Sequence, residues 1–285
     1  MKLLSNIPLK STAGFGFCLL ASIISTNDKV YANSCENLFG DNPSSINDSC
    51  YITPSTYKIR VYEMGLCTSD PLAGTSINGD DVVTDNKITE SSCTATFKSS
   101  DGTLVDLGGS SAQTLTGTNF RPANGTYPHA YIKIKNTFGL KGTYQINNQT
   151  YYTSSDGSPV TSEASHDNFD EDLMDFSNGK TCAEESPELA GAEVFTTGVT
   201  GTMKAVLAQV SGGNLGTYTA DSSCGSSTHL FGSFEPTSPV VISNQTKGLE
   251  VNFSITNRGM TVFPDRSGGM GGFGGGPFSP SFSTF

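Results

Sequence analysis

The chain contains no tryptophan and only three histidines, and just 15% of its 285 residues are charged. Helices favour Ala, Leu, Glu and Lys, whereas this chain is rich in Gly, Ser, Thr and Asn, which suits short strands joined by polar turns. Basic residues are outnumbered by acidic ones, 16 to 27, so the net charge is −11. Such a surface repels phosphate backbones, which disfavours nucleic acid as a partner.

An apolar stretch of the roughly 20 residues needed by a membrane-spanning helix is also missing. The apolar run at residues 13–24 follows Lys2 and Lys10 and precedes Val30-Tyr31-Ala32. Positive charge, a short apolar run and small residues, in this order, are typical of an export signal. We therefore predict a signal peptide over residues 1–32, with a buried helix of the mature fold as the alternative. The mature chain is expected to be secreted, on the cell surface or in the periplasm, with no transmembrane segment.

Six of the seven cysteines remain once Cys18 leaves with the signal, and an even set in an exported chain is typical of disulfides. No CxxC spacing of the kind that zinc sites use occurs. Six cysteines allow fifteen pairings, but short loops close with the least loss of entropy. The predicted disulfides are Cys35–Cys50, Cys67–Cys93 and Cys182–Cys224.

Apolar and polar residues alternate along several stretches, as they do in half-buried strands. The predicted inward rows are Tyr57, Ile59 and Val61; Ala130, Ile132 and Ile134; and Leu249, Val251, Phe253 and Ile255. His129, Tyr131 and Lys133 should then face outward. Turn-forming residues predict three hairpins, over residues 94–107 with Asp101-Gly102, over 140–153 with Asn147-Asn148, and over 249–263 with a turn at 257–259.

Residues 156–188 differ in kind, because they carry ten acidic residues against the single base Lys180. Within them, Phe169, Leu173 and Phe176 follow the spacing of one helix face. Asn168 is a suitable N-cap and Gly179 a suitable stop, so we predict one short acidic helix. Residues 265–285 contain seven glycines and four phenylalanines without a strand or helix period, so this tail is predicted to be disordered.

The predicted fold class is therefore all-β, with an antiparallel β-sandwich or sandwiches, one short acidic helix and a disordered Gly/Phe-rich C-terminal tail. Residues 33–155 form a first β-sandwich half or domain, and residues 189–264 form a second β-rich half. The acidic helical insertion at 156–188 separates them, and whether the halves make one sandwich or two is left open.

Four segments carry a resemblance to a known family: Tyr57-Lys58-Ile59-Arg60-Val61-Tyr62, Leu104-Val105-Asp106-Leu107, Asn124-Gly125-Thr126-Tyr127 and Tyr131-Ile132-Lys133-Ile134. Together they resemble the prealbumin-like (transthyretin-like) β-sandwich modules of bacterial surface proteins, over about residues 51–153. In those modules a Gly-x-Tyr turn starts a strand of alternating aliphatic residues. The resemblance implies adhesion, assembly or spacing rather than catalysis, and no functional residue is carried over from it.

Catalytic patterns are not found in the sequence. It has no Gly-x-Ser-x-Gly elbow, no zincin His-Glu pair and no phosphate-cradling glycine loop. His129, His166 and His229 stand alone, and the mature cysteines are expected to be paired rather than nucleophilic. No catalytic residue or cofactor is therefore predicted.

Calcium is the metal that the acidic loops would suit, because it prefers carboxylate and carbonyl oxygens. The candidate ligands are Asp80, Asp81, Asp85, Asp167, Asp170 and Glu171, with a solvated acidic surface as the simpler interpretation. Tyrosines that could stack on sugars are Tyr62, Tyr131, Tyr151 and Tyr152.

These observations predict a secreted or cell-surface structural or interaction protein without catalytic activity. Its partner would be a protein or a cell surface, with self-association as one option. An extracellular glycan- or calcium-binding module is the alternative, and a secreted hydrolase is a third hypothesis.

Overall fold

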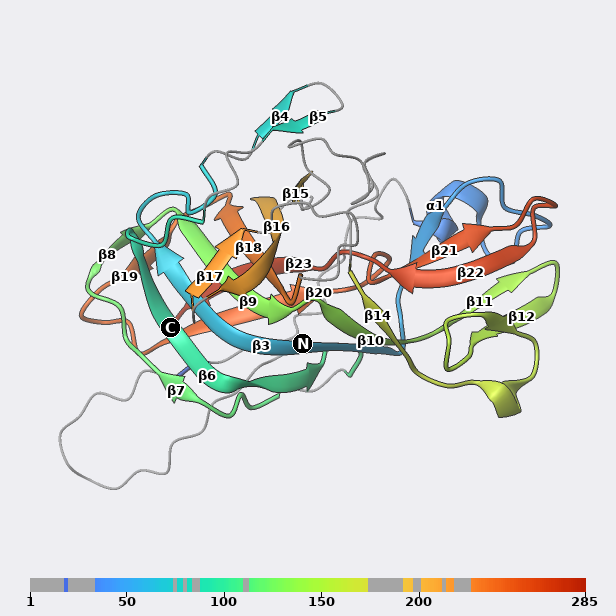
Figure 1. Ribbon diagram of the computed structural model, residues 1–285, viewed down its shortest axis with the longest axis horizontal. Coiled ribbons are helices and arrows are strands. Elements are labelled where there is room, and N and C mark those ends of the chain that lie inside the picture. The colour runs from blue at the N-terminus through green and yellow to red at the C-terminus, as the bar shows by residue number, and fades with distance from the viewer. Residues whose placement is uncertain are drawn as a thin grey trace.

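The computed structural model describes residues 18–19, 34–73, 76–78, 81–83, 88–109, 113–173, 192–196, 201–211, 214–217 and 227–285. These residues form mainly antiparallel strands, so the chain is all-β as predicted (Figure 1). The one α-helix among them, α1 (Cys35–Phe39), begins after Ser34, whose side chain accepts a hydrogen bond from the Asn37 N–H. None of the helices in these ranges is long and apolar enough to cross a membrane.

The largest sheet of the described residues has ten strands and dominates one end of the molecule (Figure 1). They are β3 (Thr56–Cys67), β6 (Cys93–Asp106), β7 (Thr118–Asn119), β9 (His129–Lys135), β10 (Thr137–Lys141), β14 (Phe169–Asp172), β15 (Ala192–Thr196), β16 (Gly201–Ser211), β17 (Asn214–Thr217) and β18 (His229–Pro236). Strand β18 pairs directly with β9, so both strand-rich parts of the chain build one sheet.

Strands β9 and β10 act as one long strand interrupted at Asn136. One flank of this strand pairs with β3, and the other pairs with β18 and β14 in succession. The buried Asn136 amide donates hydrogen bonds to the carbonyls of Leu173 and Ser227, both at 3.2 Å. This side chain therefore joins the end of β14 to the start of β18 and satisfies backbone groups that the interruption leaves unpaired.

Smaller sheets cover the inner face of the large sheet and extend from its far end (Figure 1). Their members are β1 (Cys18–Leu19), β20 (Gly248–Ser254) and β23 (Ser279–Thr284); β2 (Cys50–Ile52), β21 (Met260–Pro264) and β22 (Met270–Gly275); β11 (Thr143–Ile146), β12 (Gln149–Thr153) and β13 (Pro159–Val160); and β8 (Gly125–Tyr127) with β19 (Val240–Ile242). A separate hairpin consists of β4 (Ser76–Asn78) and β5 (Asp81–Val83). The 3₁₀ turn Glu163–Ser165 precedes β14.

The main core lies between the inner face of the large sheet and these smaller sheets. The predicted inward rows on β3, β9 and β20 all contribute to it, and their side chains are buried. The predicted turn at Asn147-Asn148 is also confirmed, because both residues have positive φ, 50° and 62°, between β11 and β12. Asn tolerates this left-handed conformation better than most residues.

Two of the three predicted disulfides are present, Cys35–Cys50 and Cys67–Cys93. The third predicted pair, Cys182–Cys224, lies outside the described residues. The region between Cys35 and Cys50, whose spacing indicates only a loop, contains α1.

The prediction of an acidic helix starting at Asn168 is wrong for the part that the structure describes. Phe169–Asp172 is strand β14, which pairs with β10, and residues 174–188 lie outside the described residues. Phe169 is buried while Asp170 and Asp172 are exposed, so the strand period of two replaces the helix period. Asp is a poor helix former, and pairing with an existing strand outweighs the weak helical pattern.

Two predicted hairpins have the right strands but the wrong partners. Residues 94–107 form no hairpin, because β6 pairs with β3 on both sides of a register shift, at which residues 99–102 bulge out. Gly102 has positive φ in that bulge, and Arg60 donates to its carbonyl. Strands β20 and β21 lie in different sheets, because β20 pairs with β23 and β21 pairs with β2 and β22.

Within residues 265–285, the tail predicted to be disordered, the structure places strands β22 and β23. Phe273 and Phe278 are buried in the main core. The glycines allow the backbone to approach its neighbours closely: a Cβ on Gly276 would lie 2.0 Å from the Arg258 carbonyl oxygen. This segment is buried through close backbone packing and only a few side chains. Hydrophobic periodicity does not detect such a pattern.

Candidate functional site

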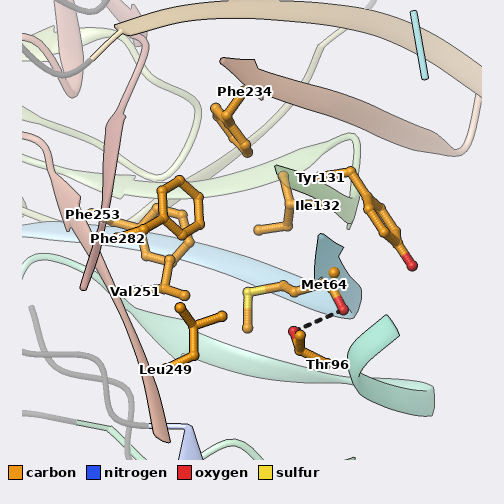
Figure 2. Close-up of a pocket in the computed structure, with 10 residues that line it drawn as sticks. Met64, Thr96, Tyr131, Ile132, Phe234, Leu249, Val251, Phe253 and Phe282 are labelled. Atoms are coloured by element: carbon orange, nitrogen blue, oxygen red, sulfur yellow. Dashed lines mark hydrogen bonds between the residues drawn. The ribbon is translucent and has the colours of Figure 1, made fainter. Parts of the chain in front are cut away.

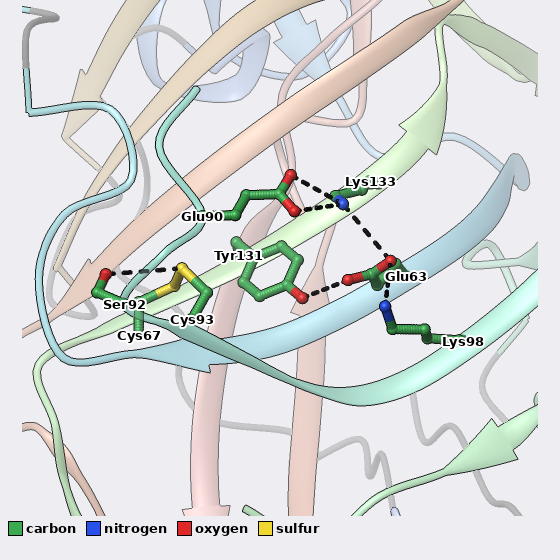
Figure 3. Close-up of polar contacts among 8 residues, drawn as sticks. All are labelled: Glu63, Cys67, Glu90, Ser92, Cys93, Lys98, Tyr131 and Lys133. Atoms are coloured by element: carbon green, nitrogen blue, oxygen red, sulfur yellow. Dashed lines mark hydrogen bonds and ion pairs between the residues drawn. A yellow bond between two sulfur atoms is a disulfide. The ribbon is translucent and has the colours of Figure 1, made fainter. Parts of the chain in front are cut away.

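Residues 68–92 form a long loop that is closed at its base. The loop leaves β3 after Cys67 and returns to β6 at Cys93, and these two cysteines are both strand partners and disulfide partners (Figure 3). Next to them, the Thr68 N–H donates to the Ser92 carbonyl at 3.0 Å. A disulfide that closes a loop of this size contributes roughly 2–4 kcal/mol to stability. The two ends of the loop are thus fixed relative to each other.

Asp70 anchors the first part of this loop to the large sheet. Its carboxylate accepts hydrogen bonds from Lys204 of β16 at 2.7 Å and from Ser233 of β18 at 2.9 Å, and also from the Leu72 N–H at 2.9 Å. Burial acts to raise the pKa of Asp70, but the hydrogen bonds from Lys204, Leu72 and Ser233 together hold this pKa below its usual value. The carboxylate is therefore ionised at neutral pH and pairs with the ammonium group.

An apolar contact follows the first anchor. Leu72 is fully buried against Tyr131, Val206 and Phe231, on the face of the sheet opposite the main core. The rings of Tyr131 and Phe231 stack with centroids 5.6 Å apart and planes 8° from parallel. The prediction that Tyr131 points outward is confirmed, because its side chain lies on the outer face of the sheet, but loop 68–92 covers this side chain and leaves it buried.

Glu90 provides the second anchor, near the returning end of the loop. It forms an ion pair with Lys133 at 2.8 Å, and Lys133 also lies 3.4 Å from Glu63 (Figure 3). Glu63 pairs in addition with Lys98 at 3.3 Å and accepts a hydrogen bond from the Tyr131 hydroxyl at 2.5 Å. Burial, and then the hydrogen bond to Glu63, raise the pKa of Tyr131, so its hydroxyl stays protonated and donates.

These charges form a connected network rather than isolated surface pairs. The side chains of Lys133 and Glu63 are only 13% and 14% exposed, whereas Lys98 is 53% exposed. Exposed ion pairs contribute little, so the central pair and its hydrogen bond to Tyr131 carry most of the effect. The returning end of the loop is therefore tied to β9 through Lys133.

Between the two anchors, the loop carries the hairpin of β4 and β5. Its backbone pairs Ser76 with Val83 and Asn78 with Asp81. In Figure 1 this hairpin lies beyond the edge of the large sheet, and β5 is near the edge strand β15. The loop thus has a fixed base, two ion-paired anchors, a buried apolar contact and a projecting hairpin.

Of the six predicted calcium ligands, the structure describes the side chains of Asp167, Asp170 and Glu171 only. Asp80 and Asp85 lie outside the described residues, and Asp81 is described only as the first residue of β5. Asp170 and Glu171 are neighbours on β14, so their side chains point to opposite faces, and Asp167 precedes that strand. No cluster of three or more His, Cys, Asp or Glu side chains suited to a metal occurs in the described ranges.

The histidines lie on separate elements. His129 begins β9 and His229 begins β18, where the His229 ring lies 4.8 Å from that of Tyr62. His166 follows the 3₁₀ turn and lies 5.1 Å from the Tyr152 ring. Burial lowers the pKa of both His166 and His229. Of the tyrosines that could stack on sugars, Tyr62, Tyr151 and Tyr152 are half-buried.

The interior of the sandwich contains a small apolar cavity. Met64, Ile132 and Phe234 of the large sheet line one side, and Leu249 and Phe282 line the other (Figure 2). Its volume is about 10 Å³, roughly the space of one water molecule. This space is too small for a substrate or cofactor, so we regard it as a packing gap between two sheets.

Sequence reasoning does not identify the anchors of loop 68–92. Two features of the sequence set this loop apart: the bracketing residues Cys67 and Cys93, and the acidic residues Asp80, Asp81 and Asp85. Asp70 and Lys204 are 134 positions apart in the chain, and no spacing rule connects them. Only the order of strands in the sheet places β16 and β18 under the loop.

Comparison of the chain with protein-family models, curated proteins and solved structures finds no match. The resemblance to prealbumin-like modules therefore stays a prediction.

Proposed function

We propose that this chain is a secreted or cell-surface interaction protein that binds its partner through loop 68–92 and has no catalytic activity. The observation that carries this proposal is the two-point anchoring of the loop, by Asp70 on Lys204 and by Glu90 on Lys133. A loop that only connected β3 to β6 would not need a disulfide base and two ion-paired anchors.

Anchoring favours binding because it reduces the entropy lost when a partner docks. Binding residues occur disproportionately on loops that a rigid scaffold positions. Here the scaffold is the large sheet, and the loop crosses β9, β18 and β16 through its contacts with Lys133, Ser233 and Lys204. The hairpin β4–β5 is the part of the loop that a partner could reach.

A protein or a cell surface is the partner class that we propose. The net charge of −11 disfavours nucleic acid, and the loop itself contains Asp80, Asp81 and Asp85. Export is supported by the N-terminal segment 1–32 together with the two disulfides, because such bonds persist in oxidising compartments.

The test compares two pairs of cysteine replacements in the full chain. Cys67→Ala with Cys93→Ala opens the base of loop 68–92, whereas Cys35→Ala with Cys50→Ala removes a disulfide elsewhere and serves as the matched control. Labelled protein is purified from the medium of the producing cells and its binding to the surface of those cells is measured. We expect the first double variant to lose most of its binding and the control to retain it.

Equal binding by the two double variants would contradict the proposed role of the loop. Absence of surface binding by the wild-type chain would contradict the proposed function itself. Intact mass under non-reducing conditions, measured on the same protein, reports the cleavage position and the number of closed disulfides.

A further inference from the structure

Strand β20 contributes one of its faces to the main core. Leu249, Val251 and Phe253 are buried on this face and line the small cavity (Figure 2). Glu250 and Asn252 alternate with them and lie on the opposite face of the strand. One face of β20 is therefore apolar and the other is polar.

One edge of β20 is occupied by β23. At the start of this pairing, Gly248 and Phe285 exchange two backbone hydrogen bonds, at 3.2 and 3.3 Å. Hydrogen-bonded pairs alternate with unbonded pairs along an antiparallel ladder, so Glu250 also directs its backbone groups to β23. Pro280 lies opposite Phe253 and has no N–H, which agrees with this alternation.

The other edge of β20 is paired only at its start in the described part of the chain. The backbone N–H and C=O groups of Leu249, Val251 and Phe253 point to this edge, because the residues between them bond to β23. Strand β1 lies there, parallel to β20, and pairs with Gly248 and Leu249. Val251 and Phe253 thus present backbone groups that pair with no described strand.

Export would lengthen this open edge. Strand β1 lies within residues 1–32, the predicted signal peptide, and cleavage of that segment removes β1. This step rests on the proposed export, whereas the open groups of Val251 and Phe253 do not. Unpaired backbone groups along a strand edge are a template for a further strand, and the position of β1 indicates that one fits here.

Two acceptors on the polar face indicate which side chains an added strand would need. Glu250 Oε1 and Asn252 Oδ1 are buried and have no hydrogen-bond partner within the described residues. The other carboxylate oxygen, Glu250 Oε2, lies 3.5 Å from the Ser283 hydroxyl. A buried acceptor without a donor is destabilising, and the charged donors of Lys and Arg bind such oxygens most strongly.

We propose that the open edge of β20 binds an extended segment of another protein by strand addition. The segment alternates apolar residues, which lie beside the buried row of β20 and extend the core, with Lys or Arg, which lie beside Glu250 and Asn252. Main-chain hydrogen bonds supply the affinity, and the alternating side chains supply the specificity. The site belongs to the inner sheet and is separate from loop 68–92.

A second copy of this chain does not fit this description within its described residues. Two of its segments have the required alternation, residues 58–61 on β3 and residues 132–135 on β9. Both strands already have a neighbour on each side in the large sheet, β3 between β6 and β9, and β9 between β3 and β18. Neither segment can therefore be donated, so the partner is a different protein.

A short synthetic peptide that alternates leucine with lysine tests the proposal. Its binding to the chain purified from the medium is measured by calorimetry. One control peptide alternates leucine with glutamate, and a second keeps leucine and lysine but has N-methylated peptide bonds, which removes the main-chain donors. We expect saturable binding of the first peptide, several-fold tighter than that of either control. Absence of binding, or equal binding of the methylated peptide, would overturn strand addition.

Charge reversal on β20 provides the matched comparison in the protein. Glu250→Lys should bind the lysine peptide several-fold more weakly than the wild type and the glutamate peptide more tightly. Glu163→Lys introduces the same change at an exposed position in the 3₁₀ turn and should bind as the wild type does. Circular dichroism checks that both variants are folded. Equal binding of the lysine peptide by the two variants would contradict the role of Glu250.

The double variant Cys67→Ala with Cys93→Ala separates this site from the proposed function. It opens the base of loop 68–92 and leaves β20 unchanged, so it should bind the lysine peptide as the wild type does, even where its binding to cells is lost. Loss of peptide binding in this variant would overturn the edge of β20 as the site.

Discussion

The ring of Tyr131 lies over Gly65, its partner on β3, so closely that a Cβ on Gly65 would fall 2.3 Å from Tyr131 Cε1. The aromatic ring occupies the space that a side chain on Gly65 would fill. This arrangement lets the Tyr131 hydroxyl reach Glu63 and the ring stack on Phe231. The burial of the outer face of the sheet under loop 68–92 depends on this close approach of Tyr131 to Gly65.

Gly65→Ala is therefore expected to destabilise the protein by about 1–3 kcal/mol, the usual range for overpacking. The new methyl group would also meet the Thr94 carbonyl oxygen at 2.5 Å, and backbone cannot move aside easily. Urea unfolding followed by circular dichroism measures the change. Gly109→Ala is the control, because its nearest neighbours would be 3.9 Å away; equal stability of the two variants would contradict the prediction.

Tyr131→Phe is expected to cost about 1.5–3 kcal/mol, because it removes a hydrogen bond to the charged group of Glu63. Tyr127→Phe is a matched comparison, since the Tyr127 hydroxyl donates at 2.8 Å to the neutral carbonyl of Ala123. That change should cost less, about 0.5–1.5 kcal/mol. A smaller loss for Tyr131→Phe than for Tyr127→Phe, in the same urea titration, would be inconsistent with the network.

Asp70→Asn tests the first anchor through its pH dependence. Because the pKa of Asp70 is lowered from 3.8 in the folded state, its stabilising contribution is complete above pH 3.8 and is lost as the pH falls through the folded pKa. The variant should be less stable than the wild type at neutral pH, by about 1.5–3 kcal/mol for a hydrogen-bonded charge. The difference should vanish in acid.

Thermal unfolding of both proteins between neutral pH and strongly acidic pH measures this effect. Asp101→Asn, at an exposed position, is the control and should match the wild type in stability at neutral pH. A constant difference between Asp70→Asn and the wild type across the whole range would refute the anchor.

The change in stability caused by Glu171→Gln should have the opposite sign to that caused by Asp70→Asn. Burial raises the pKa of Glu171 above 4.5, although the hydrogen bond from Gly275 acts against this. Its contribution is therefore complete below pH 4.5 and is lost as the pH rises through the folded pKa. Glutamine keeps an acceptor for Gly275 and carries no charge, so the variant should be more stable than the wild type at neutral pH.

The same thermal series checks Glu171→Gln, with the exposed Glu163→Gln as its control. The gain should shrink to nothing below pH 4.5. A variant that is less stable than the wild type at neutral pH would show that the carboxylate is needed in its ionised form.

Local patterns predicted the strands well, because alternation depends only on which face of a strand is buried. The rows on β3, β9 and β20 and the Asn147-Asn148 turn are examples. Strand partners could not be predicted in the same way: β20 pairs with a serine-rich strand whose pattern carries little hydrophobic signal. The helix prediction for residues 169–172 is wrong because these residues show little strand alternation of their own. Their pairing with β10 is what makes them strand β14.

The candidate site could be predicted only at its base. Proximity pairs Cys67 with Cys93, but the anchors of the loop depend on residues from distant strands. Lys133 and Lys204 face the loop because β9 and β16 flank β18, and this order of strands is a property of the whole sheet. Charge counts alone do not indicate which of the many acidic residues would be paired.

The junction of β9 with β18 has a consequence for how the chain folds. Ile132 pairs with Gly232, one hundred positions further along, while β9 also needs β3 on its other side. The centre of the large sheet can therefore close only after most of the chain has been synthesised. Such distant pairings form slowly, so the centre of the large sheet is expected to be among the last parts of the fold to close.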